Sequence, residues 1–419
     1  MQDFLYISVM KWKYSTFFLL FSAFFLQGQI NLVKNPSFEQ YSTCPRTINQ
    51  IFYANFWNGI DNNVNDTDQC NGEYYNVCAD TITGDYEGVP GFGSYLNYQY
   101  PHSGNSYIGI DLYSNLSAIP WVQRTYAKGN LSQTLISGKT YCFKMWVNLS
   151  NLSKYAADNM QVYIDNGSID TARCGMPIAI NPQIKNASGN ILTDTLNWVS
   201  IKGSFVATGN ENSVTIGNFS TNAQTQFSTF NPNGFWSHES YYLVDDVSLI
   251  ATDLPAWAGK DTSTCVGDSI YIGRSPEIGL DNVWTEIHTG NVAGHGAGVW
   301  VKPDTSTTYV VTQDLCGAVT HDTIRVTVNC IGVREYSKNA LINIYPNPAS
   351  TVLNIKMGIQ NETAEIKIVD LLGNEVLNQK LEVKSNITQI DINCLKEGIY
   401  FTNIITLQGI TAKKIIVQR

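Results

Sequence analysis

The stretch that decides the fold class is Thr140-Tyr141-Cys142-Phe143-Lys144-Met145-Trp146-Val147. Its residues alternate, so that Tyr141, Phe143 and Met145 share one face of an extended strand. The same period of two recurs in the segments 160–164, 198–201, 213–216 and 241–249. No convincing long helical pattern follows the N-terminal segment, and we therefore predict an all-β protein.

The composition agrees with a large β-protein that acts outside the cell. A length of 419 residues predicts two to four domains. The 32 Gly residues suit turns, and the 23 Tyr residues suit half-buried strands. Only 15% of the residues are charged. The formal net charge is -9, and Lys and Arg form no cluster beyond short pairs. Because binding to phosphates needs a basic patch, we expect no nucleic-acid partner.

The N-terminus has the pattern of a secretory signal peptide over residues 1–29. Lys11 and Lys13 precede an apolar run over residues 17–26, which is too short to span a bilayer comfortably. Asp3 precedes Met10 in an otherwise superfluous extension, so Met1 and Met10 are alternative starts. No later segment reaches transmembrane length, and we expect a mature chain without a transmembrane segment that is exported through the periplasm.

The cysteines indicate disulfides, because an exported chain meets an oxidising environment. The sequence has nine cysteines, an odd number, so at least one thiol has no partner within the chain. We favour Cys70–Cys78, which closes a short loop, and Cys265–Cys316, although sequence alone leaves the connectivity open. The absence of CxxC spacing and the presence of only 5 His argue against a zinc site.

Turn residues and changes of pattern divide the chain into three β-rich parts. A large domain is predicted over residues 30–251, and Asp253-Leu254-Pro255 marks its end. A smaller domain with several short strands is predicted over 256–332. A mostly polar linker over 333–341 leads to a third domain over 342–419.

The third domain carries Tyr345-Pro346-Asn347-Pro348-Ala349-Ser350, then Leu371-Leu372-Gly373-Asn374, Lys396-Glu397-Gly398-Ile399 and a terminal Lys413-Lys414 strand. These blocks closely resemble the type A C-terminal sorting domain of the type IX secretion system in Bacteroidetes. The resemblance implies a small β-sandwich that is recognised by the type IX machinery and is removed after passage through the outer membrane. The protein would then be released or attached to surface lipopolysaccharide, in an extracellular or outer cell-surface location.

The resemblance assigns the sorting signal to Pro346, Asn347, Pro348, Gly373, Gly398, Lys413 and Lys414. The two prolines fix an extended approach to the domain, and Gly373 suits a hairpin turn.

The middle domain resembles the Ig-like or PKD-like repeats that often precede such sorting domains. The segments 258–269 and 305–309 carry this likeness, which implies a spacer. Gly267-Asp268-Ser269 is interpreted as a turn that enters a strand. It has no partnered His or oxyanion segment and so does not indicate a lipase-type nucleophile.

The first domain opens with Asn31-Leu32-Val33-Lys34-Asn35-Pro36-Ser37-Phe38-Glu39 and closes with Tyr241-Tyr242-Leu243-Val244-Asp245-Asp246-Val247. This order resembles the jelly-roll of carbohydrate-binding modules and galactose-binding-like domains, in which the first and last strands lie side by side. Glu39, Asp245 and Asp246 would then approach one another, and the resemblance implies a structural Ca²⁺ that relieves their repulsion. We expect no organic cofactor.

A glycan site needs exposed aromatic rings, because pyranose faces stack on ring faces. The candidate ligand-binding residues lie mostly in loop-like or turn-flanked contexts, and they are Trp57, Tyr74, Tyr95, Trp121, Trp146 and Trp236. The segment 46–100 departs from carbohydrate-binding modules, so the position of the ligand site stays open.

No catalytic motif stands out, whether Ser/His/Asp, Cys/His, HExxH or paired carboxylates in a known pattern. The leading hypothesis is a non-catalytic surface or secreted protein whose first domain binds glycan. One alternative is a polysaccharide-active hydrolase that uses carboxylates of the first domain. Another is an adhesive or structural surface component, for example one associated with gliding.

Overall fold

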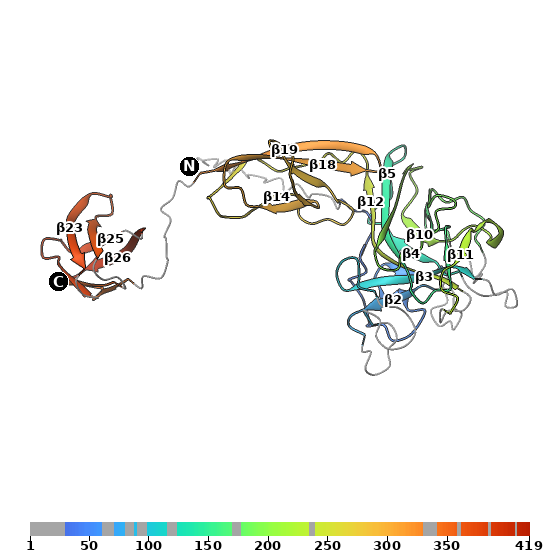
Figure 1. Ribbon diagram of the computed structural model, residues 1–419, viewed down its shortest axis with the longest axis horizontal. Helices are drawn as coiled ribbons and strands as arrows, with labels where there is room; N and C mark the ends of the chain where they lie inside the picture. The colour runs from blue at the N-terminus through green and yellow to red at the C-terminus, as the bar shows by residue number, and fades with distance from the viewer. Residues whose placement is uncertain are drawn as a thin grey trace, which may run out of the picture. The chain divides into compact units, whose positions relative to one another are not determined.

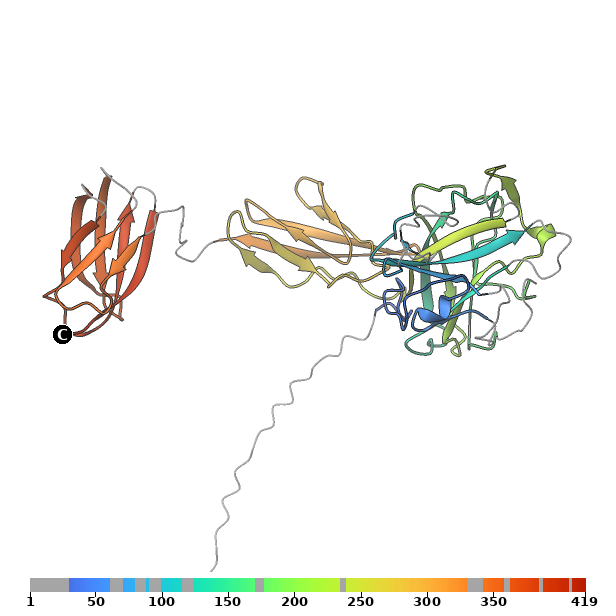
Figure 2. The same cartoon turned by 90° about the horizontal axis from the view of Figure 1, so that it is seen from below.

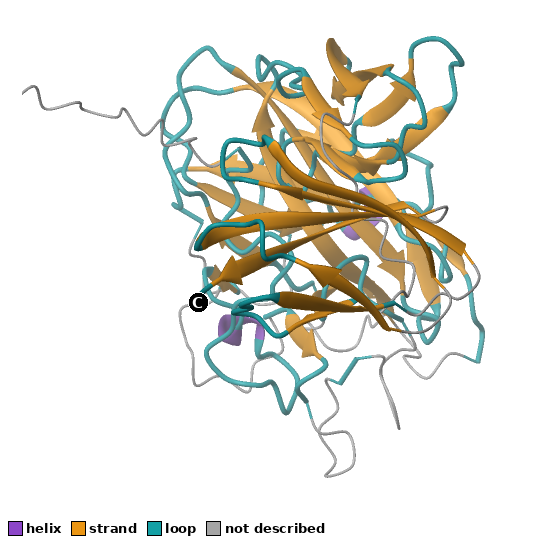
Figure 3. Ribbon diagram, turned by 90° about the vertical axis from the view of Figure 1, so that its left-hand side faces the viewer, coloured by secondary structure: helices purple, strands orange, loops and turns teal. Residues whose placement is uncertain are grey.

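The computed structural model describes residues 30–60, 71–79, 88–89, 99–114, 124–169, 177–233, 239–329, 342–357, 362–383, 387–406 and 409–419. The chain divides into two compact units, Met1–Val328 and Asn329–Arg419. Strands dominate (Figure 3), and the only helices in the described residues are the short 3-10 turns η1 (Ile51–Tyr53) and η2 (Asn222–Gln224). The predicted all-β fold is confirmed.

No helix within these described ranges combines the length and the apolar character needed to cross a membrane. The predicted signal peptide, residues 1–29, lies outside the described residues.

The first unit begins with a sandwich of two five-stranded antiparallel sheets. One sheet has the order β1 (Trp57–Asn58), β4 (Ala127–Asn130), β10 (Ser213–Gly217), β7 (Gln161–Asp165), β8 (Ile184–Lys185). The other, called the β5 sheet here, has the order β2 (Glu73–Asn76), β3 (Ser106–Ser114), β12 (Glu239–Ala251), β5 (Thr140–Leu149), β9 (Val199–Val206). Successive strands from β3 to β5 alternate between the sheets, as in a jelly roll. A small ribbon pairs β6 (Tyr155–Ala157) with β11 (Phe227–Thr229).

Strand β5 is the stretch whose alternation predicted the fold, and it pairs with β12 on one side and with β9 on the other. Strands β5 and β12 are labelled in Figure 1. Tyr141, Phe143 and Met145 are buried in the core between the two sheets, as the period of two requires. Lys144 and Trp146 therefore belong to the opposite face of the β5 sheet, which we call the outer face.

A second sandwich completes the first unit. Its larger sheet has the order β13 (Thr262–Thr264), β19 (Ala318–Val328), β18 (Thr307–Leu315), β15 (Val283–Glu286), β16 (Val292–His295). A two-stranded sheet pairs β14 (Ile270–Gly273) with β17 (Gly298–Val301). Trp284 is fully buried in this core, and its indole N–H donates to the Gly296 carbonyl at 3.1 Å.

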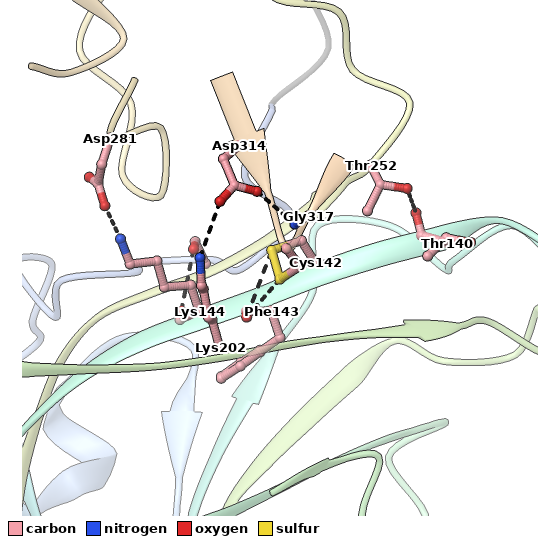
Figure 4. Close-up of a disulfide and its surroundings, with 11 residues drawn as sticks. Thr140, Cys142, Phe143, Lys144, Lys202, Thr252, Asp281, Asp314 and Gly317 are labelled. Carbon is pink, nitrogen blue, oxygen red and sulfur yellow. Dashed lines mark hydrogen bonds and ion pairs between the residues drawn. A yellow bond between two sulfur atoms is a disulfide. The ribbon is translucent and has the colours of Figure 1, made fainter. Parts of the chain in front are cut away.

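The two sandwiches of the first unit are joined by a disulfide and by two ion pairs (Figure 4). Cys142 on β5 is bonded to Cys316, which lies in the turn between β18 and β19. Lys144 pairs with Asp281, and the Lys202 ammonium lies 3.3 Å from an Asp314 carboxylate oxygen. The side chains of Ile250, Leu280 and Leu315 form a small apolar cluster with Cys142. The joint therefore combines a covalent bond, charge and apolar burial.

Both disulfides favoured from the sequence are wrong. Cys78 is bonded to Cys44, with 5.9 Å between their Cα atoms, and is not available to Cys70. Cys316 is bonded to Cys142, which lies 174 residues earlier. Both sequence predictions paired cysteines within one predicted domain. In the structure, Cys142 on a strand of the first sandwich is bonded to Cys316 in a turn of the second sandwich. Cys394 is the free thiol of the described residues, and it is exposed.

The second unit is a smaller sandwich, and its strands can be followed in Figure 2. One sheet has the order β20 (Asn343–Tyr345), β21 (Val352–Lys356), β24 (Ile387–Asp391). The other has the order β23 (Glu375–Val383), β22 (Glu362–Val369), β25 (Gly398–Thr406), β26 (Gly409–Val417). Leu353, Ile366, Ile404 and Ile415 are among the residues that fill its core.

Candidate functional site

A cleft of about 480 Å³ lies where the outer face of the β5 sheet meets loops of the second sandwich. The first sandwich lines it with His102, Trp146 and Asp246. The second sandwich contributes side chains from segments 276–281 and 295–298. A concave site of this size that combines an aromatic ring with a few polar groups is typical of small-ligand binding.

Trp146, a predicted ligand-binding residue, is a half-buried member of this cleft. The imidazole of His102 stacks on its indole, with ring centroids 4.1 Å apart and planes 17° apart. The ammonium of Lys144 lies 4.6 Å from the centroid of the same ring. Trp198 contacts the edge of His102 at a centroid distance of 6.1 Å. The indole is thus held in one orientation, with a cation beside it.

The imidazole of His102 is fixed by the carboxylate of Asp246. His102 Nδ1 and Asp246 Oδ2 are 2.5 Å apart, and the hydroxyl of Ser103 donates to Asp246 Oδ1 at 2.6 Å. Asp246 has a φ of 48°, in the left-handed region that non-glycine residues adopt rarely. A strained backbone that directs a carboxylate into a cleft is a common feature of binding sites.

Asp245 precedes Asp246 of the His102–Asp246 pair in the sequence and is fully buried. Its carboxylate accepts hydrogen bonds from the backbone N–H of Asp246 at 2.7 Å and of Ser103 at 3.1 Å. Burial raises the pKa of Asp245 well above its ordinary value, and the neighbouring Asp246 carboxylate raises it further. The side chain anchors the segment that carries His102.

Glu39, the third predicted calcium ligand, binds the same segment further along. Its carboxylate accepts from the backbone N–H of Asn105 at 2.7 Å and from the Ser106 hydroxyl at 2.8 Å. Gly104 leaves room for this, because a Cβ there would lie 2.3 Å from Glu39 Oε1. The N-terminal segment does run beside β12, since the Val247 N–H donates to the Pro36 carbonyl at 2.8 Å.

The donor set at this segment does not form a ready calcium cage. Within the described part of the chain, no three His, Cys, Asp or Glu side chains gather closely enough to hold a metal ion. The carboxylates of Glu39, Asp245 and Asp246 instead accept hydrogen bonds from the segment 102–106. Structural calcium at these residues stays a prediction.

Two of the predicted aromatic platforms are core residues. Trp57 is buried and its indole N–H donates to the Asn35 carbonyl at 3.0 Å. Tyr74 is buried, its hydroxyl donates to the Phe38 carbonyl at 2.9 Å, and burial raises its pKa to about 12. Both rings therefore pack into the sandwich and are not exposed platforms, because the loop-like segments that carry them fold into its core. Tyr95, Trp121 and Trp236 lie outside the described residues.

Sequence reasoning missed a group of acidic residues on the outer face of the β5 sheet. Asp111 lies on β3 between the core residues Ile110 and Leu112, so its side chain belongs to the outer face. It is almost completely buried, and within the part of the chain that the structure describes its Oδ1 has no hydrogen-bond partner. Burial, followed by the carboxylates of Glu239 and Glu73, raises the pKa of Asp111 well above its ordinary value. Burial raises the pKa of Glu239 to about 7.

Strand alternation is the signal that could have identified Asp111. It places the Asp111 carboxylate on the face of β3 that lies opposite the core face of its neighbours Ile110 and Leu112. The same face holds Tyr75 and Tyr241, whose hydroxyl oxygens are 2.8 Å apart. Gly109 makes this pair possible, since a Cβ there would lie 1.6 Å from the Tyr241 hydroxyl. The outer face thus carries a buried polar network in addition to the cleft.

In the second unit, the predicted sorting residues occupy turns and the last strand. Pro346 and Pro348 lie in the bend that joins β20 to β21, rather than in an extended segment, and both follow cis peptide bonds. The side chain of Asn347 donates to the Lys414 carbonyl at 3.0 Å and accepts from the Ile416 N–H at 2.8 Å. Two hydrogen bonds of Asn347 therefore connect the segment 346–348 to β26.

The other sorting residues have separate positions in this unit. Gly373 has a φ of 85° in the turn between β22 and β23. Gly398 begins β25, and Lys413 and Lys414 are exposed on β26.

Residues 343–418 match the family described as the secretion system C-terminal sorting domain. The second unit is a sorting domain. This confirms the resemblance seen in the sequence, and it implies handling by the type IX secretion machinery and a cell-surface or extracellular location. No curated protein matches the chain as a relative.

Solved structures that resemble the chain include a xylan-binding domain and an adhesin domain. The CBM22-1 xylan-binding domain of Paenibacillus barcinonensis Xyn10C is 13% identical, with 37% of this chain and 78% of that chain covered and a TM-score of 0.22. The K1 cleaved adhesin domain of Lys-gingipain from Porphyromonas gingivalis is 16% identical, with 51% and 95% covered and a TM-score of 0.25. Likeness at these TM-scores carries no argument about function.

Proposed function

We propose that this secreted protein is a non-catalytic glycan-binding protein, and that the glycan binds in the cleft at Trp146. The observation that supports this most is the fixed aromatic ring among polar groups. Trp146 lines the cleft, and the part of its half-buried indole that His102 and Lys144 leave uncovered is the surface proposed for the C–H groups of a sugar ring. The carboxylate of Asp246 and the ammonium of Lys144 lie beside it, and they are an acceptor and a donor for sugar hydroxyls.

The second sandwich supports the same proposal, because it provides part of the cleft. Glu277 and Asp281 line the cleft and add carboxylate acceptors. The Asn31 N–H donates to Glu277 at 3.1 Å, so that this loop is tied to the first sandwich. The Ig-like part is then a component of the binding site, in addition to any role as a spacer.

The test is retention of the purified protein on a glycan array and on insoluble polysaccharides. We expect wild-type protein to bind one class of glycan, and Trp146→Ala to bind roughly tenfold more weakly, the loss of one aromatic contact. Leu196→Ala is the matched control, because Leu196 is 83% exposed on the first sandwich and outside the cleft. Failure of the wild-type protein to bind any glycan would overturn the proposal.

A second candidate function, polysaccharide hydrolysis, is favoured by one observation. Glu239 is partly exposed and has a pKa of about 7, beside the buried carboxyl of Asp111. A carboxylic acid that keeps its proton near neutral pH can act as a general acid on a glycosidic oxygen. Release of reducing ends from polysaccharide, abolished by Glu239→Gln, would establish this function in place of simple binding.

Structural calcium is a proposal that rests on Glu39, Asp245 and Asp246. Ions that bind the folded state alone raise its melting temperature, by an amount that grows with the logarithm of the ratio of ion concentration to Kd. Melting curves recorded in calcium and in chelator test this directly. A lower melting temperature in chelator supports a bound ion, and superimposable curves reject it.

We also propose that the sorting domain is removed after export, and that the remaining protein is released or attached to surface lipopolysaccharide. The match of residues 343–418 to the sorting domain supports this. Intact-mass measurement of the exported protein, with comparison of the medium and cell-surface fractions, would distinguish the two fates. An exported protein that keeps the terminal strand β26 would contradict removal.

A further inference from the structure

The second sandwich carries a row of aromatic side chains that contributes little to its core. Tyr271 on β14 and Trp300 on β17 are paired across the two-stranded sheet, with ring centroids 5.5 Å apart. Their strand neighbours Ile272, Val299 and Val301 face the core, so the two rings belong to the opposite face. Trp300 is 69% exposed, an unusual fraction for a tryptophan in a folded protein.

The row continues across the edge of β14 to a second tryptophan. The segment of Trp257 runs beside β14, because the Gly273 N–H donates to the Ala258 carbonyl at 3.0 Å. Trp257 is 38% exposed, and the guanidinium of Arg274 lies 5.4 Å from the centroid of its ring. The Tyr271 hydroxyl donates to the Arg274 carbonyl at 2.7 Å. Contacts therefore connect Trp257, Arg274, Tyr271 and Trp300, which we call the aromatic row.

The surroundings of the row keep its side chains in place. Gly298 leaves the space that Tyr271 occupies, since a Cβ at Gly298 would lie 2.6 Å from the Tyr271 hydroxyl. One Arg274 Nη2 N–H donates to the Pro255 carbonyl at 3.1 Å, and Arg274 Nε is a buried donor that finds no hydrogen-bond partner among the described residues. Burial lowers the pKa of this guanidinium, and the carboxylate of Asp322 partly opposes that effect.

We propose that the aromatic row is a second binding surface that takes an acidic polysaccharide, with sugar rings on the tryptophans and a uronate carboxylate on Arg274. Exposed aromatic rings that are neighbours on a rigid sheet match the repeating apolar faces of a sugar chain. A guanidinium is the side chain best suited to a carboxylate, through charge and directed N–H donors. On a protein with a formal net charge of -9, a local cation beside Trp257 favours an anionic group at that point.

This surface goes beyond the proposed function, because Trp257, Tyr271, Arg274 and Trp300 do not line the Trp146 cleft, although Gly298 borders both. The two sites can therefore be tested independently in the same protein. A chain that occupied both would gain affinity from two linked contacts.

The experiment is affinity electrophoresis of the whole protein in gels that contain polygalacturonate or its methyl-esterified form. The esterified polymer has the same sugar rings without the charge. We expect polygalacturonate to retard wild-type protein, and esterification to reduce the retardation several-fold. Trp300→Ala should weaken binding roughly tenfold, and Arg274→Gln should remove the difference between the two polymers.

Two controls make the result decisive. Val292→Ala truncates another exposed side chain of the same sandwich, at 57% exposure, and should bind as wild type does. Leu196→Ala truncates an 83% exposed side chain of the first sandwich, outside both sites, and should also keep this binding. The proposal is wrong if polygalacturonate does not retard the wild-type protein, or if Trp300→Ala and wild-type protein are retarded equally. Equal retardation of wild-type protein by both polymers would overturn the role of charge.

Discussion

The two faces of the β5 sheet are both largely buried, but by different chemistry. The inner face packs residues such as Phe143 and Met145 against the other sheet of the first sandwich. The outer face carries Cys142, Lys144 and Trp146 on the same strand, and it meets the second sandwich through a disulfide, ion pairs and a cleft. Apolar packing is non-directional, whereas polar contacts need defined partners. We therefore expect the inner face to contribute mainly to the free energy of unfolding. The outer face determines how the sheet contacts the second sandwich and forms the cleft.

The largest expected effect concerns the inner face. Phe143→Ala removes a fully buried ring from the core and should destabilise the first unit by about 4 kcal/mol. Urea unfolding followed by tryptophan fluorescence measures this loss. Trp146→Ala on the outer face is the comparison, and a loss as large as that of Phe143→Ala would remove the distinction between the two faces.

The next effect concerns the covalent joint on the outer face. Replacing both Cys142 and Cys316 by Ser opens a connection of 174 residues and should cost about 3 kcal/mol. Cys394→Ser is the matched control, since this thiol is free and exposed. Thermal melting under non-reducing conditions should separate the two variants. Identical melting temperatures would show that the ion pairs and the apolar cluster suffice to hold the sandwiches together.

A pH-dependent effect tests the buried carboxyl groups of the outer face. Burial raises the folded-state pKa of Glu239 from 4.5 to about 7, so the folded protein binds this proton more tightly than the unfolded chain does. The free energy of unfolding should therefore fall as the pH rises from about 4.5 to 7, by about 2 kcal/mol after allowance for the exposure of the side chain.

Glu239→Gln should remove this part of the pH dependence and should stabilise the protein at pH 8 relative to wild type. Asp304→Asn, at an exposed carboxylate, is the control and should leave the profile unchanged. Urea unfolding at a series of pH values supplies the measurement. A wild-type profile that is flat between pH 4.5 and 7 would contradict a buried, proton-binding Glu239.

The smallest expected effect concerns an exposed ion pair at the same joint. Lys202 and Asp314 are 50% and 46% exposed, and solvent and salt weaken the attraction between them. Lys202→Met should change the free energy of unfolding by no more than about 0.5 kcal/mol. A loss near that of the disulfide variant would mean that charge, and not the covalent bond, dominates the joint.

The inner face and the outer face also differ in how far the sequence predicts them. Alternation at 140–147 is enough to place Phe143 in a core, because a half-buried strand has a simple period. The sorting domain is equally accessible to sequence, since its motifs are local and contiguous. The same alternation places Trp146 on the opposite face, yet it does not tell what covers a side chain there.

The failures have one physical cause, which is that tertiary neighbours are not encoded locally. Trp57 and Tyr74 lie in segments with many turn residues, but both rings pack into the sandwich. Cys142 and Cys316 are paired because a strand of one sandwich meets a turn of the other. His102 contacts Trp146 and Asp246 across three segments that are far apart in the sequence. Such contacts appear only once the sheets are assembled.

The measurement that tests the central claim most directly is calorimetric titration of wild-type and Trp146→Ala protein with the glycan that an array selects. We expect roughly tenfold weaker binding by Trp146→Ala with an unchanged melting temperature, while Leu196→Ala and Trp300→Ala keep wild-type affinity for a short oligosaccharide. Equal affinity of wild-type and Trp146→Ala protein would contradict a ligand site in this cleft.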